Sequence, residues 1–356
     1  MDGPDRAVAS AERQQRVDVV LDRFFSLAKS RAAEFGGAYV QLWHSLEANT
    51  TGGKRFRPRM VMCTYQALGG EDLETAAYVG SAFELLHTAL IVHDDVIDRD
   101  FTRRGMPNIA GTYRDLAAAT GVPNAVAEHR GISAAVIAGD LALFNAYRLI
   151  DRSGVAGAMR GRLIDLMDEA LFASAAGELI DVDFASGAEM PRVDDILMME
   201  RLKTAVYSFE CPLQAGAILA GAPDAVVTTL GEFGREIGIA YQLVDDVLGV
   251  FGREEETGKT TIGDLREGKR TVMISYATST PEWAGIAGLV GKADLSEAEA
   301  SDIRAVLVES GAKAFADGLA RYYANRAVAR LAEPHIPRAL REELLPVAES
   351  VLGRVR

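Results

Sequence analysis

Cysteine is scarce in this chain. Only two of its 356 residues are cysteine, Cys63 and Cys211, and neither belongs to a CxxC or Cys/His spacing typical of a zinc site. Both lie in apolar surroundings, where an isolated cysteine usually packs as a small hydrophobic residue. The sequence therefore argues against a disulfide framework or a structural zinc and favours a reducing compartment.

Positive charge is also in deficit. The 38 Lys and Arg residues stand against 51 Asp and Glu residues, which gives a formal net charge of −13. Binding to a nucleic-acid backbone depends on clustered positive charge, so we expect no general nucleic-acid surface. Basic residues that bind a ligand must therefore form local clusters.

Long uninterrupted apolar runs are missing too. The first 18 residues are polar and carry acidic side chains, unlike the apolar core of a secretory leader. No run reaches the roughly 18 uninterrupted apolar residues typical of a membrane span. We therefore expect a cytoplasmic protein without an integral membrane segment.

Alternating strand patterns are scarce, whereas helical periodicity runs through most of the chain. Apolar residues recur at steps of three and four, for example at Val79, Phe83, Leu86 and Leu90. Breaks such as RRGMPN and AGAPDA separate segments of helical length. The chain is 49% hydrophobic and has no Pro- or Ser-rich linker, so we predict an all-α fold with a single domain over residues 1–356.

Two of the expected helices are apolar nearly all round before their acidic ends. They cover residues 80–100 and 161–184. Helices of this kind belong in the middle of a large bundle, where their polar groups can face inward around a cavity.

The segment IVHDDVIDRD places four aspartates in ten residues. Asp94 and Asp98 share a helix face one turn apart, Asp95 lies nearby, and like charges at this spacing destabilise a helix. Such carboxylates suit Mg²⁺, which binds one or two carboxylates together with substrate phosphate oxygens. A solvated helix end is the alternative. Because Arg103 and Arg104 follow directly, and guanidinium groups bind phosphate well, we favour a magnesium–diphosphate site.

A second acidic segment begins YQLVDDVLGVFG. Gln242 and Asp245 lie on one helical stripe with a row of glycines, each of which costs roughly 1 kcal/mol relative to alanine. The glycines indicate either close packing of another helix or room for a ligand, and the two polar groups favour the ligand. Lys259 and Lys269 follow in a glycine-containing loop. The glycines of the stripe are Gly231, Gly234, Gly238, Gly249 and Gly252.

Two further segments carry isolated cations. Lys54 and Arg57 belong to the glycine-started turn TTGGKRFRP, which is weak evidence for a site when taken alone. Lys203 and Thr204 lie within the apolar segment RLKTAVYSF. An unpaired buried ammonium would be costly there, so we expect an anionic partner for Lys203.

Together these motifs resemble the trans-isoprenyl diphosphate synthase family, also called polyprenyl synthetases, and are closest in character to geranylgeranyl diphosphate synthases. The resemblance extends from GGKRFRP through ELLHTALIVHDDVIDRDFTRRG and KTAVYSF to GKTTIGDLREGKRT. It implies helices around a deep central cavity, usually in a homodimer. It also implies head-to-tail condensation of isopentenyl diphosphate with dimethylallyl, geranyl or farnesyl diphosphate by ionisation, condensation and proton elimination. Mg²⁺ is the implied cofactor, with three ions when the allylic diphosphate is bound.

The resemblance also assigns roles to individual residues. The implied metal ligands are Asp94, Asp95, Asp98 and Asp245. The implied contacts to the allylic diphosphate are Arg103, Lys203, Gln242, Lys259 and Lys269. The implied pocket for isopentenyl diphosphate consists of Lys54, Arg57, His87 and Arg104. The residues implied in catalysis are Asp94, Asp98, Lys203, Thr204 and Asp245. Metal ions and cations would neutralise the leaving diphosphate, and a metal-poor pocket would hold the second substrate without activating it.

Product length in this family depends on side chains that precede the first aspartate. Leu90 and Ala89 occupy the positions where a bulky aromatic residue stops growth at fifteen carbons. The next aromatic residue is Phe83, roughly 16 Å from Asp94 by helical rise. We therefore expect geranylgeranyl diphosphate, with farnesyl or longer polyprenyl diphosphates as alternatives.

The sequence departs from the family pattern at several positions. Gly249 replaces an aspartate of the second motif, Glu178 replaces a usual glutamine, and Ala110 replaces a frequent histidine. The basic C-terminal end is reduced to Arg354 and Arg356. A class I terpene cyclase and a non-catalytic partner subunit are less favoured, because both aspartate segments and the GGKRFRP turn are present.

Overall fold

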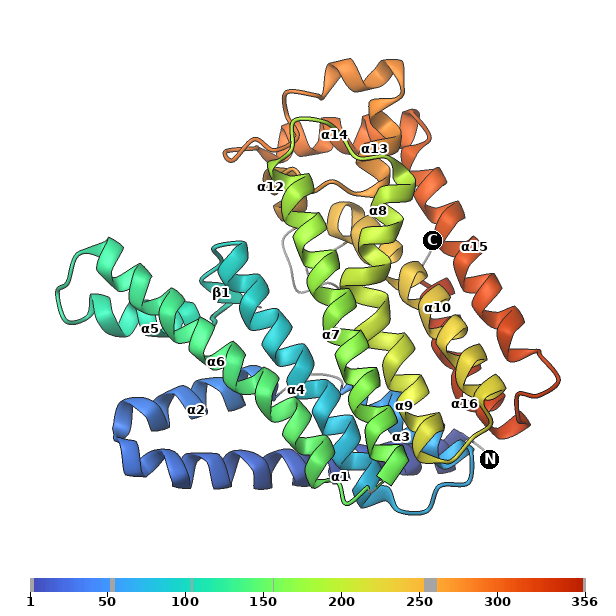
Figure 1. Cartoon of the computed structure of the whole chain (residues 1–356). Helices are drawn as coiled ribbons and strands as arrows, with labels where there is room; N and C mark the ends of the chain where they lie inside the picture. Colours follow the sequence, from blue (N-terminus) through green and yellow to red (C-terminus); the bar gives the residue numbers. More distant parts are fainter. Residues whose placement is uncertain (1–2, 52–54, 104, 156, 253–260, 355–356) are drawn as a thin grey trace. The chain divides into compact units, whose positions relative to one another are not determined.

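The chain folds almost entirely into helices in the computed structural model, which describes residues 3–51, 55–103, 105–155, 157–252 and 261–354 (Figure 1). The all-α prediction is confirmed. The described residues also form one two-stranded antiparallel hairpin, in which β1 (Thr102–Arg103) pairs with β2 (Met106–Pro107).

Contacts group the chain into two compact units. One comprises residues 1–169 and 212–223, and the other comprises residues 170–211 and 224–356. The single domain and the deep central cavity expected from the sequence stay predictions. We describe each unit by itself.

The first unit is organised around the apolar helix α4. Helix α4 packs against α6 along much of its length, and α3 and α1 also contact it (Figure 1). At its start, the Asp72 carboxylate accepts a hydrogen bond of 3.1 Å from the backbone N–H of Thr75 and so caps the first turn. The helices of this unit are α1 (Gly3–Ala32), η1 (Ala33–Phe35), α2 (Gly37–Thr50), α3 (Phe56–Ala67), α4 (Leu73–Ile97), α5 (Ile109–Ala118) and α6 (Asn124–Arg152).

Helices α4 and α6 are both long and apolar enough to cross a membrane by length and composition. The protein buries 72% of the most apolar window of α4 but only 39% of that of α6. Helix α4 is therefore a core helix of its unit, whereas α6 keeps an exposed apolar face. The cytoplasmic location stays a prediction.

The second unit is organised around helix α10, which packs against η2 and α15 (Figure 1). Helices α7 (Gly157–Ser186) and α9 (Cys211–Leu219) contribute residues to both units. The remaining helices are α8 (Val193–Glu200), η2 (Arg201–Glu210), α10 (Asp224–Phe251), α12 (Gly263–Glu267), α13 (Val272–Thr278), η3 (Pro281–Gly285), α14 (Glu297–Glu309), α15 (Ala312–Leu331) and α16 (Arg338–Leu352).

Glycines on α10 let η2 approach closely. A Cβ atom on Gly234 would lie 2.6 Å from the Cα of Glu210, and one on Gly238 would lie 2.7 Å from the Cα of Ala205. Real Cβ atoms do not approach backbone so closely. The expectation that the glycine stripe makes room for a ligand is therefore wrong at these two positions, where close helix packing explains the glycines.

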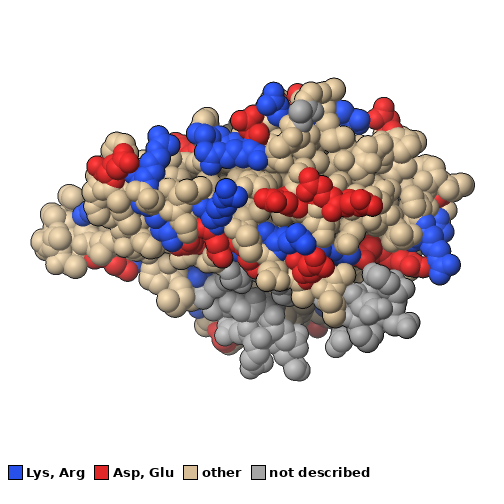
Figure 2. Space-filling model, turned by 90° about the horizontal axis from the view of Figure 1, so that it is seen from below, with Lys and Arg blue, Asp and Glu red and all other residues tan. Residues whose placement is uncertain are grey.

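Acidic and basic side chains alternate over short distances on the face shown in Figure 2. Basic side chains are thus interspersed on this face although acidic residues outnumber them along the chain, 51 against 38. Local clusters of charge, rather than the net charge, therefore decide where an anionic ligand binds.

Gly177 on α7 is the point at which this helix meets the backbone of η2. A Cβ atom at Gly177 would lie 2.2 Å from the backbone N of Lys203. Because backbone cannot rotate away, we expect Gly177→Ala to lower the free energy of unfolding by about 1–3 kcal/mol. Chemical denaturation measures this change.

Gly161 provides a matched control on the same helix. A Cβ atom there would meet no other atom within 4 Å. Gly161→Ala should therefore be neutral or stabilise the protein by up to about 1 kcal/mol, through helix propensity. Equal effects of the two substitutions would contradict the close contact at Gly177.

Candidate active site

The acidic end of α4 presents its aspartates on two different sides. Asp94 is half-buried and Asp98 is exposed, and the two stand one turn apart as the sequence predicts. Asp95, in contrast, is buried within the first unit and is only 3% exposed. Asp94 and Asp98 thus offer carboxylate oxygens at the surface of the helix end, and Asp95 does not.

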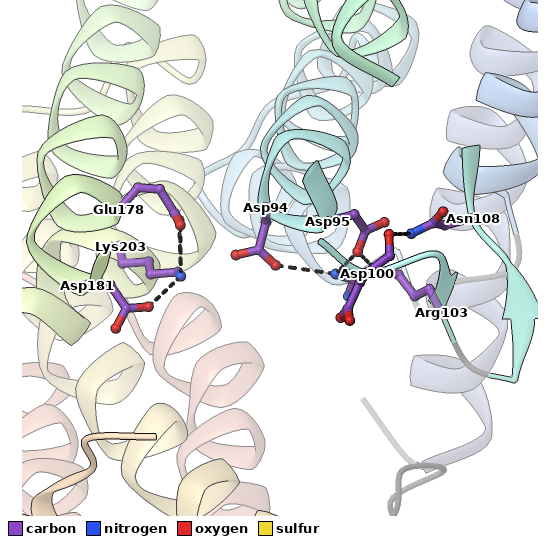
Figure 3. A network of polar contacts seen from close by, with 8 residues as sticks. All are labelled: Asp94, Asp95, Asp100, Arg103, Asn108, Glu178, Asp181 and Lys203. Atoms are coloured by element: carbon purple, nitrogen blue, oxygen red, sulfur yellow. Dashed lines mark hydrogen bonds and ion pairs between the residues drawn. The ribbon is translucent and has the colours of Figure 1, made fainter. Parts of the chain in front are cut away.

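The hairpin that follows α4 returns Arg103 to these aspartates (Figure 3). Arg103 donates from Nε and Nη2 to Oδ1 of Asp95, at 2.9 and 2.6 Å, and from Nη2 to Oδ2 of Asp94 at 3.3 Å. The Asn108 side chain stabilises this hairpin, because its Nδ2 donates a hydrogen bond of 2.8 Å to the backbone carbonyl oxygen of Asp100. Asp95 therefore positions Arg103, and binding of a metal by Asp95 would require this ion pair to open.

Burial and pairing act in opposite directions on this ion pair. Burial raises the pKa of Asp95, and the hydrogen bonds and charge of Arg103 offset this rise only in part. Burial alone would lower the pKa of Arg103, but the hydrogen bond and charge of Asp95 outweigh it and raise that pKa. Arg103 therefore stays a cation beside the acidic cluster.

A partly accessible stripe leads along α4 away from the aspartates. Asp98, Asp94, Leu90 and His87 follow one another at steps of three and four, and each retains some exposure. The next side chain on this stripe is Phe83, which is fully buried. Along this stripe, solvent exposure therefore ends at Phe83, which is the residue predicted to limit the chain length of the product.

Ala89 lies elsewhere on the helix. It is 1% exposed and is about 140° around α4 from Asp94. Of the two positions next to the aspartates that were predicted to affect product length, Leu90 faces the stripe and Ala89 faces the core.

In the second unit, Lys203 has the anionic partners expected for a cation in an apolar segment (Figure 3). Its Nζ donates to Oδ2 of Asp181 at 2.7 Å and to Oε1 of Glu178 at 3.2 Å. Both carboxylates project from α7. Lys203 and Thr204 themselves lie in η2, a π-helical segment, and such segments often occur at functional sites.

A separate cluster surrounds Asp246 on α10. Gln242 donates to Oδ1 of Asp246 at 3.0 Å, and Nζ of Lys269 donates to the same oxygen at 2.9 Å. Glu200 lies close by and is 2% exposed, without a hydrogen-bond partner for either oxygen in the described part of the chain. Burial raises the pKa of Glu200 well above its ordinary value, and the charge of Asp246 raises it further.

The neighbouring Asp245 side chain is 45% exposed. Nη2 of Arg354 lies 3.5 Å from its Oδ1, so the reduced basic C-terminal end still places one cation beside this aspartate.

Near the end of α10, a Cβ atom on Gly249 would lie 2.2 Å from Oδ2 of Asp264. The Asp264 carboxylate therefore occupies the space that a longer side chain at position 249 would need.

For several predicted site residues, the structure adds little evidence about their role. Lys54, Arg104 and Lys259 lie outside the described residues. Arg57 is half-buried in α3, and His87 is half-buried on α4. Their assignment to a pocket for isopentenyl diphosphate stays a prediction.

Sequence reasoning missed several groups that hold the predicted residues. The sequence motifs assign no role to Asp181, Glu200 or Asp246. The i, i+3 spacing of Glu178 and Asp181 was a usable signal for Asp181. No local pattern could show Glu200, because its neighbours Asp246 and Lys269 come from distant segments.

Comparisons with known proteins place these features in a family. A family model for polyprenyl synthetases matches residues 40–307. The chain belongs to the polyprenyl synthetase family. It is a trans-isoprenyl diphosphate synthase family enzyme, and its chemistry is the condensation of prenyl diphosphates.

Related polyprenyl synthetases differ in the product that their names state. A geranylfarnesyl diphosphate synthase of Aeropyrum pernix is 33% identical over 80% of this chain and 84% of that protein. A (2E,6E)-farnesyl diphosphate synthase of Mycobacterium bovis is 31% identical over 86% of this chain and 81% of that protein. A crystal structure of geranylgeranyl pyrophosphate synthase from Corynebacterium glutamicum, complexed with isoprenyl diphosphate and magnesium, is 30% identical with a TM-score of 0.88, covering 96% of this chain and 98% of that chain. Family membership alone therefore does not fix the product length.

The different burial of Asp95 and Asp98 predicts different effects of their removal. We expect Asp98→Ala to change the free energy of unfolding by less than about 0.5 kcal/mol, because the side chain is exposed. Turnover should fall by orders of magnitude if this carboxylate binds magnesium. Asp95→Ala should lower the free energy of unfolding by about 1–3 kcal/mol, because it leaves Arg103 without its main partner.

Chemical denaturation and steady-state kinetics of the two variants test this distinction. Asp115→Ala is a matched control, since Asp115 is an exposed aspartate of the same unit that forms an ion pair with the adjacent Arg114. This substitution should leave the free energy of unfolding and the turnover close to those of the wild type. Loss of stability in Asp98→Ala with retained turnover would contradict the assignment.

Proposed function

We propose that this enzyme condenses isopentenyl diphosphate head-to-tail with dimethylallyl, geranyl and farnesyl diphosphates and releases geranylgeranyl diphosphate. The observation that carries the proposal is the stripe on α4. It begins at Asp98 and Asp94, passes Leu90 and His87, and closes at Phe83. One helix thus provides an acidic end for a metal-bound diphosphate and a partly exposed stripe of limited length.

The residues present fit Mg²⁺. Asp94, Asp98 and Asp245 offer carboxylate oxygens with some exposure, which are the ligands that this hard cation prefers. We assign these three to three Mg²⁺ ions bound with the allylic diphosphate. Bound magnesium would neutralise the charge that develops on the leaving diphosphate.

A set of cationic and polar side chains would bind the allylic diphosphate. Arg103 and Lys203 are each held by carboxylates in this structure, and a bound diphosphate would replace or share these partners. Gln242 and Lys269 share Asp246 as partner, and their predicted contacts to the diphosphate require them to leave that oxygen. Lys259 completes the proposed set.

The second substrate needs a site that does not activate its diphosphate. We assign Lys54, Arg57, His87 and Arg104 to this site, because cationic and neutral donors bind a diphosphate without the polarisation that a metal supplies. The double bond of isopentenyl diphosphate would then face the allylic carbon.

The proposed reaction needs no side chain of the protein as general base. The allylic C–O bond breaks and diphosphate leaves with the electron pair, and the π electrons of isopentenyl diphosphate form the new C–C bond, which leaves a carbocation. The released diphosphate then takes a proton from a carbon next to this cation, and the electrons of that C–H bond form the new double bond. Thr204 and the backbone of Lys203 would steady the cation as neutral dipoles.

Phe83 is the proposed limit of chain growth. It lies on the stripe of α4 at the point where exposure ends, roughly 16 Å from Asp94 by helical rise. A prenyl tail that follows this stripe would meet its ring. Leu90 is small enough to let the tail pass, and an aromatic residue there would stop growth earlier.

Product chromatography tests the proposal. The wild-type enzyme with Mg²⁺, isopentenyl diphosphate and each allylic starter should yield geranylgeranyl diphosphate as the main product. Phe83→Ala should shift the main product to a longer chain by at least one five-carbon unit, because it removes the ring that ends the path.

Phe25→Ala is the matched control, because Phe25 is also a fully buried phenylalanine of the first unit and lies on α1. It should lower stability by about 3–5 kcal/mol, as a cavity does, without lengthening the product. An unchanged distribution in Phe83→Ala would remove Phe83 as the limit. A cyclic hydrocarbon would indicate a terpene cyclase, and lack of turnover by the isolated chain would indicate a partner subunit.

We also propose that the enzyme is a homodimer that uses α6. This helix is apolar yet largely unburied within its unit, and Val126, Ile137 and Phe144 lie exposed along one side of it. The exposed fraction of Phe144 is 62%. A second copy of the chain would cover this side, as isologous contacts do in twofold dimers.

Sedimentation velocity tests this arrangement. Phe144→Glu should convert the dimer to monomers at micromolar concentration, because it places a charge in the proposed apolar contact. Val308→Glu on α14 adds the same charge at another exposed apolar residue and should leave the dimer intact. A monomeric wild type, or a dimeric Phe144→Glu variant, would contradict the use of α6.

A further inference from the structure

The start of α3 is held by a buried arginine that has no role in the proposed reaction so far. Arg55 is 6% exposed and stands directly before Phe56, the first residue of α3. Its backbone has a φ of 47°, in the left-handed region that residues other than glycine rarely adopt. Such a conformation persists where the surrounding structure fixes it, and conformations of this kind cluster at functional sites.

Three separate helices provide the contacts that fix Arg55. Its Nε donates to Oδ1 of Asp18 on α1 at 3.0 Å, and its Nη1 donates to the backbone carbonyl of Thr50, the last residue of α2. The same Nη1 donates to Oε1 of Glu84 on α4 at 3.3 Å. One guanidinium group thus joins the start of α3 to α1, α2 and α4.

Glu84 depends on this contact in turn. Its side chain is 7% exposed, and Arg55 is the cation that pairs with it within the described part of the chain. Its second oxygen, Oε2, is buried and has no hydrogen-bond partner among the described residues. A buried carboxylate that loses its charge partner is strongly destabilising, so the two side chains hold each other in place.

Backbone packing beside this ion pair fixes the same turn a second time. A Cβ atom on Gly80 would lie 3.0 Å from the Cα of Pro58, so the first turn of α3 packs directly against α4. Gly80, Glu84 and His87 follow one another at steps of four and three, which places them on one face of α4. The beginning of α3 is therefore fixed against the face of α4 that carries His87.

This arrangement connects the two described members of the proposed pocket for isopentenyl diphosphate. Arg57 follows Arg55 by two residues in the first turn of α3, and His87 follows Glu84 by three residues on α4. The ion pair between Arg55 and Glu84 therefore links the segment that carries Arg57 to the segment that carries His87. Substrate-binding groups need such fixed positions, because a displacement of about 1 Å can cost on the order of 100-fold in rate.

We propose that Arg55 is a positioning residue for isopentenyl diphosphate, whose pairing with Glu84 sets the position of Arg57 relative to His87. This inference rests on the proposed function, which assigns Arg57 and His87 to that substrate. Arg55 itself stays with its protein partners and does not contact the diphosphate. Loss of Arg55 therefore weakens the binding of isopentenyl diphosphate and spares the allylic substrate, which is assigned to other side chains.

Isothermal titration with isopentenyl diphosphate in EDTA, together with steady-state kinetics, tests the proposal. Arg55→Met removes all three contacts and should weaken the binding of isopentenyl diphosphate and raise its KM about tenfold or more. The KM for geranyl diphosphate should change less than twofold. Arg55→Lys keeps the charge without the guanidinium fork, so its KM for isopentenyl diphosphate should lie between those of the wild type and Arg55→Met.

A second variant keeps the test decisive if Arg55→Met does not fold. Glu84→Gln preserves the size of the side chain and removes its charge, so Arg55 loses its partner on α4 only. This variant should raise the KM for isopentenyl diphosphate about threefold or more, with a far-ultraviolet spectrum like that of the wild type. Its KM for geranyl diphosphate should again change less than twofold.

Arg59→Met is the matched control. Arg59 lies one turn further along α3 and is exposed, and its guanidinium group has no hydrogen-bond or ion-pair partner in the part of the chain that the structure describes. The substitution makes the same chemical change as Arg55→Met without breaking a contact between helices. Each KM should therefore stay within twofold of that of the wild type.

The two substrates separate a positioning role from a general loss of structure. Equal increases of both KM values in Arg55→Met and Glu84→Gln would overturn the positioning role, and so would an unchanged KM for isopentenyl diphosphate in both variants. A wild-type enzyme that neither binds isopentenyl diphosphate nor extends geranyl diphosphate with it would instead overturn the proposed function.

Discussion

Pairing between crowded carboxylates and a few cations is the constraint on which the functional part of this protein depends. Asp94 and Asp95 repel each other at the end of α4, and Arg103 offsets this repulsion through hydrogen bonds to both. In the other unit, Lys203 would be costly within its apolar segment without Glu178 and Asp181. Without ligand, these charged groups therefore pair with one another.

The same pairs suit the proposed reaction, because magnesium and diphosphate can replace the internal partners. Magnesium would bind carboxylates, and diphosphate would bind the released cations, so opposite charges stay paired when substrate binds. Asp95 differs from Asp94 and Asp98 in this exchange. Since it is buried against Arg103, it holds the cation in place rather than offering oxygens to a metal.

Close helix packing gives these charged groups fixed positions. Gly177 lets α7 touch the backbone of η2 beside Lys203, and Gly234 and Gly238 do the same between η2 and α10. These contacts tie the helix that carries the acidic partners of Lys203 to the segment that carries Lys203. The row of glycines on α10, which the sequence predicted to make room for a ligand, is in part the contact surface between α10 and η2.

Helical periodicity was enough to predict several features of this protein. The spacing of Asp94 and Asp98, the stripe that reaches Phe83 and the all-α fold all depend on residues a few positions apart, which helix geometry places on known faces. The folded chain was needed to see that Asp95 faces Arg103, that Glu200 lies beside Asp246, and that Gly234 and Gly238 meet η2. Those relations join residues from distant segments, and local periodicity cannot specify which helices pack together or which charges they bring into contact.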